Sequence, residues 1–213
     1  MKINRIIISL LVVIFTCLTV IGCSKEPVTS SNEKIAYISI KEDIHYEKTF
    51  DELHLGNVYN YHLKLPQADK TWVTIWVEGY KNGEKMEPFH LDELSYGNNP
   101  NHVSEGHMGL GLINPESEVP LLFLYSSDAS IRPHKIENVL NQEGVGGSVW
   151  EYAIGKEEVA LESGETRVLG IYRQVKDSFR PYDPEDNNQI TQMINEGMTV
   201  LVLKIKVELR DRP

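Results

Sequence analysis

The sequence predicts a mainly β fold, a β-sandwich with one short helix near its C-terminus. Apolar and polar residues alternate with a period of two over much of the chain after Ile35, which is typical of half-buried strands. About nine short stretches of this kind are separated by turn residues. Only residues 183–196 combine the start signal, the apolar stripe and the end signal of a helix. Many short strands joined by turns favour two packed sheets, closest to an Ig-like β-sandwich.

The first strands are predicted at residues 58–65 and 72–80. Tyr59, Tyr61, Leu63 and Leu65 share one face of the first strand. The aliphatic face of the second consists of Val73, Ile75 and Val77. Asn82-Gly83 then gives a strong hairpin signal, because both residues tolerate positive φ. The chain should therefore return as a strand from Lys85 to Phe89.

The middle of the chain is less regular. Proline, glycine and asparagine interrupt any period over residues 87–106 and predict a long loop. In residues 107–114, apolar residues alternate with Gly109 and Gly111, which indicates close approach by another element or a bulge. Residues 118–126 are almost continuously apolar, as in a central strand buried on both faces.

The last third contains the predicted helix. Residues 132–147 fit either a short helix or an irregular strand. Asp183 is expected to cap the helix over 183–196, with Pro184 at its first position and Gly197 at its C-terminal cap. Further strands are predicted at residues 148–154, 157–161, 167–175 and 199–209.

The N-terminus carries the most specific pattern in the chain. A basic start with Lys2 and Arg5 precedes an apolar run from Ile6 to Val20, which is typical of a secretory signal. The ending, Val20-Ile21-Gly22-Cys23, resembles the lipobox of bacterial lipoproteins. This resemblance implies that the Cys23 thiol receives a diacylglyceryl group and that cleavage leaves Cys23 as the first residue. The alternatives are a plain signal peptide cut elsewhere and an uncleaved anchor, for which the run is short of the ~20 residues of a membrane-spanning helix.

These observations divide the chain into a signal peptide (1–22), a flexible polar tether (23–34) and a single β-sandwich domain (35–213). The expected location is the extracytoplasmic face of the cell membrane, where the lipid, a palmitate-type anchor, would hold the protein. Loss of the two cations in the signal changes the formal net charge from −10 to −12. So acidic a protein is repelled by nucleic acid.

Cysteine usage excludes further classes of function. Cys17 leaves with the signal and Cys23 is the lipid site, so we expect no disulfide in the mature chain. A thiol nucleophile and a cysteine-based zinc site are disfavoured for the same reason.

A second resemblance concerns the C-terminal half. Val149-Trp150-Glu151-Tyr152 through Ser163-Gly164-Glu165-Thr166 resembles the Ig-like proteinase-inhibitor domains of Bacillus-type bacteria, which also place a Trp-bearing strand before a Gly-Glu turn. The resemblance implies an Ig-like sandwich and a surface-attached proteinase inhibitor that would present one loop to an active site. A rigid, protruding loop at 89–106 would favour this alternative. The whole chain is also similar to uncharacterised lipoproteins of Bacillus-type cells, which implies no function.

The histidines offer one candidate for chemistry. A cluster of histidines and carboxylates suits zinc and would make the protein a lipid-anchored hydrolase. Their spacing matches no metal motif, so we expect solvated loop histidines, no metal and no cofactor. The residues concerned are His90, His102 and His107, with Asp92 and Glu105 nearby.

The remaining candidate is an aromatic row on the strand at 72–80. Trp72, Trp76 and Tyr80 point the same way, about 6.6–7 Å apart from one to the next. Such a row could stack on cell-wall sugars or hold a protein partner; alternatively, a second sheet or the helix covers it. The sequence therefore predicts a non-enzymatic binding module whose ligand is an unknown protein or cell-wall component.

Overall fold

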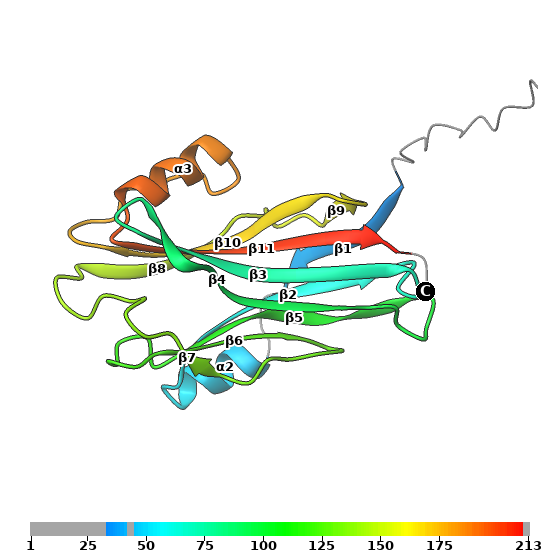
Figure 1. Cartoon of the computed structure of the whole chain (residues 1–213), viewed down its shortest axis with the longest axis horizontal. Coiled ribbons are helices and arrows are strands. Elements are labelled where there is room, and N and C mark those ends of the chain that lie inside the picture. Colours follow the sequence, from blue (N-terminus) through cyan, green and yellow to red (C-terminus); the bar gives the residue numbers. More distant parts are fainter. Residues whose placement is uncertain (1–32, 42–44, 211–213) are drawn as a thin grey trace, which may run out of the picture. The chain divides into compact units, whose positions relative to one another are not determined.

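Two antiparallel sheets form the body of the protein in the computed structural model, which describes residues 33–41 and 45–210 (Figure 1). The larger sheet contains, in order across it, β7 (His134–Lys135), β6 (Leu121–Ser126), β5 (Ser104–Ile113), β2 (Gly56–Leu65), β1 (Lys34–Ile40) and β9 (Val159–Glu162). The smaller sheet contains β4 (Glu84–Gly97), β3 (Thr71–Lys81), β11 (Thr199–Leu209), β10 (Thr166–Val175) and β8 (Gly147–Tyr152). Helices α2 (His45–Glu52) and α3 (Asn187–Glu196) lie outside the sheets. The prediction of a mainly β sandwich with one short C-terminal helix is confirmed.

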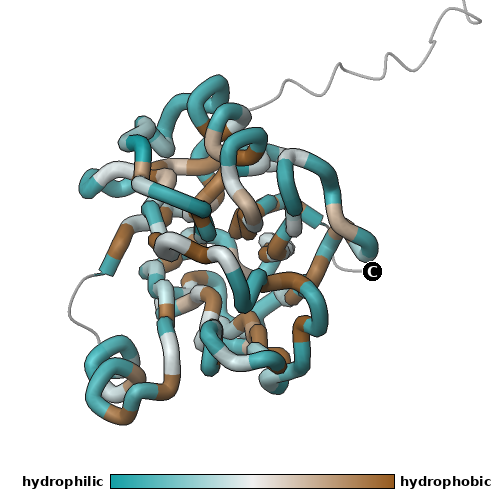
Figure 2. The backbone as a smooth tube through the Cα atoms, turned by 90° about the vertical axis from the view of Figure 1, so that its left-hand side faces the viewer, coloured by the Kyte–Doolittle hydropathy of each residue, from teal (hydrophilic) through white to brown (hydrophobic). Residues whose placement is uncertain are grey.

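The main core fills the space between the two sheets. It takes the predicted faces of β2 and β3 together with alternate residues of β11, and Val73, Ile75 and Val77 are completely buried. In an end-on view, many hydrophobic positions lie toward the middle and hydrophilic ones in the outer loops (Figure 2). Alternation along each strand is thus the signal that assigned these residues to the core.

A second, smaller core lies on the outer face of the five-stranded sheet, under α3. Ile190 and Met193 of the helix pack there against Ile171, Val200 and Val202 of the sheet. The helix therefore covers only one end of the outer face.

The helix begins later than expected. Asp186, not Asp183, is its N-cap, because the Asp186 carboxylate accepts a hydrogen bond from the Asn188 backbone N–H at 2.8 Å. Asp183 instead accepts from the Glu185 N–H in the preceding turn, at 2.9 Å. The predicted C-terminal cap at Gly197 is confirmed by its N–H bond to the Met193 carbonyl.

The long loop predicted for residues 87–106 is wrong. The hairpin at Asn82-Gly83 is confirmed, with both residues at positive φ, but β4 continues as far as Gly97. β4 is an edge strand, where the missing N–H of Pro88 is tolerated, and its register shifts opposite Glu78. Only residues 98–103 remain as a loop before β5.

Two other expectations are corrected. Beyond the two-residue strand β7, residues 136–146 form neither a helix nor a strand, although Ile136, Val139 and Leu140 enter the main core. β6 is buried on one face only: Leu122 and Leu124 are in the core, whereas Phe123 and Tyr125 remain partly exposed. Helix α2 has no counterpart among the predicted elements.

The signal peptide, Cys23 and most of the tether lie outside the described residues. Neither described helix is long and apolar enough to span a bilayer.

Candidate functional site

The predicted aromatic row lies on the outer face of the five-stranded sheet, as its alternation on β3 requires. Trp76 stands between Lys204 of β11 and Glu93 of β4 in the strand register. Its ring is only 9 % exposed, whereas Trp72 and Tyr80 are half-buried. Trp76 is therefore covered, but polar side chains of neighbouring strands do this, rather than a second sheet or the helix.

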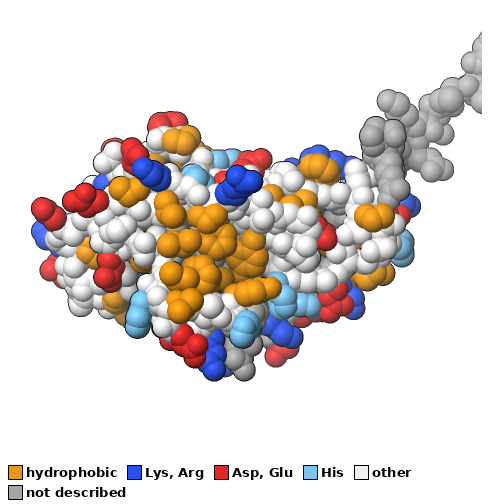
Figure 3. All heavy atoms as spheres, turned by 90° about the horizontal axis from the view of Figure 1, so that it is seen from below, with side chains coloured by type: hydrophobic (Ala, Val, Ile, Leu, Met, Phe, Trp, Pro, Cys, Tyr) orange, Lys and Arg blue, Asp and Glu red, His pale blue; other side chains and the backbone are white. Residues whose placement is uncertain are grey.

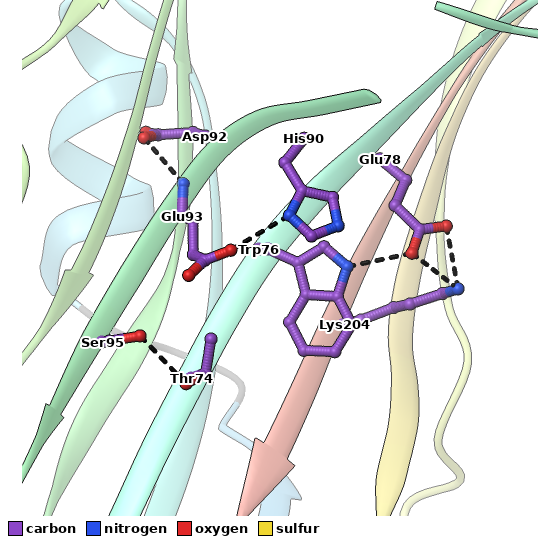
Figure 4. A network of polar contacts seen from close by, with 8 residues as sticks. All are labelled: Thr74, Trp76, Glu78, His90, Asp92, Glu93, Ser95 and Lys204. Atoms are coloured by element: carbon purple, nitrogen blue, oxygen red, sulfur yellow. Dashed lines mark hydrogen bonds and ion pairs between the residues drawn. The ribbon is translucent and has the colours of Figure 1, made fainter. Parts of the chain in front are cut away.

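Glu78 is the centre of a polar network around Trp76 (Figure 4). Its carboxylate accepts hydrogen bonds from the Trp76 indole N–H and from the Tyr80 hydroxyl, both at 2.9 Å. The Lys204 ammonium lies 2.8 Å from the second carboxylate oxygen, and the Glu78 side chain is only 6 % exposed. These three donors together compensate the buried negative charge of Glu78.

These contacts change the acidity of Glu78. Burial raises the pKa of its carboxyl, but hydrogen bonds from Lys204 and Trp76 and the positive charge of Lys204 oppose this effect. The net pKa of Glu78 lies below its ordinary value. The carboxylate is thus stably ionised at neutral pH and suits a structural ion pair.

The three aromatic rings of the row all have partners within the molecule. The Arg210 guanidinium lies 4.7 Å from the Trp72 ring centroid. Tyr80 packs against the small core under α3 and donates to Glu78. Consequently, an incoming ligand would have to displace contacts that the protein already makes.

The histidines proposed for a metal site are distributed over separate pairs. His90 lies 3.0 Å from Glu93, and His102 lies 2.9 Å from Asp69. His107 packs edge-on against His62, which itself pairs with Glu105 at 3.1 Å. In residues 33–41 and 45–210, no three His, Cys, Asp or Glu side chains are arranged to hold a metal ion.

Asp92 is separate from these exposed histidines. Its side chain is 8 % exposed and its carboxylate lies 3.8 Å from His134. Burial raises the pKa of Asp92, and the nearby His134 only partly opposes this. His107 is linked to the predicted carboxylate Glu105 only through His62, and neither Glu105 nor Asp92 pairs with His90 or His102.

The loop expected to protrude is short and bound to the sandwich. The backbone N–H groups of Asn98 and Asn99 donate to the carbonyls of Thr71 and Ala68, and the Ala68 N–H donates to His102. Residues 98–103 thus form a short connection that is hydrogen-bonded to the sandwich, rather than the extended loop required by the inhibitor hypothesis.

A different surface lies on the outer face of the six-stranded sheet. Two rows cross the strands there: Val58 of β2, Gly111 of β5 and Phe123 of β6, and beside them Asn60, Gly109 and Tyr125. A Cβ atom at Gly111 would overlap the Phe123 ring, so the ring lies directly over the glycine. At Gly109 a Cβ atom would meet the Tyr59 backbone carbonyl first and then the hydroxyl end of Tyr125, whose hydroxyl donates to the Asn60 side-chain oxygen at 2.9 Å. The absence of a side chain at Gly111 therefore allows the Phe123 ring to pack directly against the sheet.

Helix α2 contributes two further aromatic residues to this surface. Tyr46 and Phe50 are four residues apart on α2 and so lie on one face of the helix. The Phe50 and Phe123 ring centroids are 6.2 Å apart, and those of Phe123 and Tyr125 are 5.9 Å apart. Together with Val58 these four aromatic residues line a hollow of about 210 Å³, here called the aromatic cavity.

The aromatic cavity is accessible. Tyr46 is 52 % exposed, and hydrophobic side chains gather into one patch on the face seen from below, where α2 and β6 lie (Figures 1 and 3). Soluble domains seldom expose such a contiguous aromatic surface unless it binds something.

The cavity has an acidic border. Glu47 and Asp51 of α2 line hollows that adjoin it and share Val58 or Phe50 with it. Burial, followed by the nearby Glu47 carboxylate, raises the pKa of Tyr125. No lysine or arginine is among the described residues that line these three hollows. The Lys48 ammonium of α2 lies 3.7 Å from Glu52, at the solvent-exposed surface.

The sequence interpretation missed this surface. A continuous apolar run at 118–126 concealed that Phe123 and Tyr125 face outward, and α2 was not predicted. The useful signal was the alternation of Gly109 and Gly111, which correctly indicated close approach, here by aromatic rings of the next strand.

Comparison with known proteins gives no relative: no family model, no curated protein and no solved structure matches the chain.

Proposed function

We propose that the protein is a membrane-anchored extracytoplasmic lipoprotein, an Ig-like sandwich that acts by binding rather than by catalysis. The lipid on Cys23 would hold it at the outer face of the cell membrane, and residues 24–32 would connect the sandwich to that lipid. The lipobox pattern at Val20–Cys23 supports the anchor.

The aromatic cavity is the observation that carries the binding role. It is a concave, accessible, mostly apolar site, which is typical of ligand-binding surfaces. The Phe123 ring can lie where it does only because residue 111 has no side chain, although glycine within a strand weakens a sheet. We prefer this site to the row of Trp72, Trp76 and Tyr80, because the rings of that row already have partners in the fold.

The anchor is tested by labelling cells with a palmitate analogue. Wild-type protein should take up the label and sediment with membranes, whereas Cys23→Ser should remain unlabelled and either unprocessed or released. Cys17→Ser is the matched control and should behave as wild type. A wild-type protein without label would contradict the lipoprotein proposal.

The binding role is tested by photo-crosslinking in cells. A photoreactive phenylalanine at Tyr46 should form adducts that mass spectrometry of the purified protein detects, whether they are small or large. The same group at Phe179, an exposed aromatic residue outside the cavity, is the control. Equal labelling at both positions, or none at Tyr46, would contradict a binding site at the aromatic cavity.

A further inference from the structure

We propose that the aromatic cavity binds a small quaternary ammonium ion, with the trimethylammonium group held against the rings of Tyr46, Phe50, Phe123 and Tyr125. This proposal rests on the proposed binding role and adds the chemical class of the ligand.

Ring geometry is the first argument. A cation is attracted to the faces of aromatic rings through their quadrupole, and several rings around one hollow form the cage that binds quaternary ammonium groups. The Phe123 ring lies over Gly111 of β5, and its plane is inclined by 41° to the Phe50 ring and by 37° to the Tyr125 ring. Tyr46 and Phe50 of α2 line the same cavity.

Size is the second argument. The cavity of about 210 Å³ is smaller than the ~300–1,000 Å³ of sites for drug-sized ligands. It therefore fits a compact head group better than an extended molecule.

Charge is the third argument. Glu47 and Asp51 of α2 line hollows that adjoin the cavity and share Val58 or Phe50 with it. The whole chain carries a formal net charge of −10, so its field attracts cations. A neutral apolar ligand would gain nothing from these charges.

The lining also disfavours a sugar. Sugars stack on aromatic rings, but their hydroxyl groups need hydrogen-bond partners within the site. The five lining residues offer only two hydroxyl groups, and the Tyr125 hydroxyl already donates to Asn60. A quaternary ammonium ion has no hydrogen-bond donor to satisfy.

The test is calorimetric titration of the full-length protein in maltoside micelles, which contain no ammonium group. Choline is compared with 3,3-dimethylbutan-1-ol, which has the same shape without the charge, and with glucose. We expect choline to bind at least tenfold more tightly than the neutral alcohol, and glucose not to bind. Phe123→Leu, which keeps an apolar side chain but removes the ring, should weaken choline binding at least tenfold.

Two further variants complete the design. Glu47→Gln should weaken choline binding several-fold while leaving the affinity for the neutral alcohol unchanged. Phe179→Leu, which lies outside the cavity, should bind as wild type. Thermal unfolding of each variant without ligand shows whether the fold is intact.

The outcomes separate the two proposals. Equal binding of choline and the neutral alcohol, or binding of glucose alone, would overturn the cation assignment and leave the aromatic cavity as a binding site. If no compound binds, the cation assignment fails, and photo-crosslinking at Tyr46 still decides independently whether the cavity binds another ligand.

Discussion

Glu78 shows how one side chain can change the meaning of a sequence pattern. The alternation on β3 places Trp76 and Tyr80 on an outward face, where they look available for binding. Glu78 lies between them in sequence and accepts a hydrogen bond from each, while Lys204 neutralises its charge. A carboxylate flanked by aromatic residues at i−2 and i+2 on a strand thus converts an exposed row into a closed network.

Replacement of this carboxylate should destabilise the fold. Glu78→Gln leaves the half-buried Lys204 without its partner, so we expect a loss of about 3 kcal/mol in the free energy of unfolding at pH 7. Glu93→Gln is the control on the neighbouring strand: this exposed pair with His90 should contribute about 0–1 kcal/mol. Urea unfolding measures both, and equal costs would contradict the central role of Glu78.

The stability difference between wild type and Glu78→Gln should depend on pH. Because the pKa of Glu78 is lower in the folded than in the unfolded state, its stabilising contribution is complete above the unfolded pKa. The contribution is lost as the pH falls through the folded pKa. The stability difference between wild type and Glu78→Gln should therefore shrink below about pH 4.

At the scale of elements, short local signals decide where the helix begins. Asp183-Pro184 has the composition of a helix start, but Asp183 is used in a turn, and Asp186 provides the cap three residues later. With Asp186 as the cap, Ile190 and Met193 pack against Ile171 and Val202 of the sheet.

The two aspartates should differ in stability measurements. Asp186→Ala removes the bond to the Asn188 N–H and should cost about 0.5–2 kcal/mol. Asp183→Ala, the matched control, leaves the helix cap intact and should cost less. A larger effect of Asp183→Ala in chemical denaturation would contradict the assignment of Asp186 as N-cap.

The glycines of β5 allow a second test at this scale. A methyl group at Gly111 would overlap the Phe123 ring, so Gly111→Ala should displace the ring and cost about 1–3 kcal/mol. In a Phe123→Ala background the same change should cost much less, because the ring is absent. Gly155→Ala meets only the flexible end of Glu185 and is the control. Equal costs in both backgrounds would show that the ring does not need Gly111.

At the scale of the whole molecule, one core joins the two sheets. β3 and β11 contribute their aliphatic faces to it, and β1, β2, β5 and β6 close it from the other side. The predicted division of β3 into an inner and an outer face is confirmed, since Val73, Ile75 and Val77 are all in this core.

Adjacent residues on β3 should therefore respond very differently to truncation. Ile75→Ala leaves a cavity between the sheets and should cost about 2–5 kcal/mol, a large share of a typical domain's stability of about 5–15 kcal/mol. Thr74→Ala removes only an exposed hydrogen bond to Ser95 at 2.9 Å and should cost about 1 kcal/mol or less. Urea unfolding with an unchanged m-value measures both, and similar costs would contradict the assignment of faces.

Much of this architecture could be predicted because alternation is local. Strand faces, the Asn82-Gly83 hairpin and the Gly197 cap depend on residues within a few positions of each other. The continuation of β4 beyond Phe89 was missed because an edge strand tolerates Pro88 and a shift of register, which sequence period alone does not reveal. The aromatic cavity was missed because it combines β2, β5 and β6 with α2, and their proximity depends on strand order.

The construction of α2 has a consequence for exchange with solvent. The helix has eight residues, none of them buried, and isolated helices shorter than about 12–15 residues are marginally stable in water. Its backbone amides should therefore exchange hydrogen through local opening, at a lower free energy than the unfolding of the sandwich. Each opening should carry Tyr46 and Phe50 away from Phe123 and Tyr125, which belong to β6, so the complete set of four rings should be lost and re-formed at the rate at which α2 opens and closes.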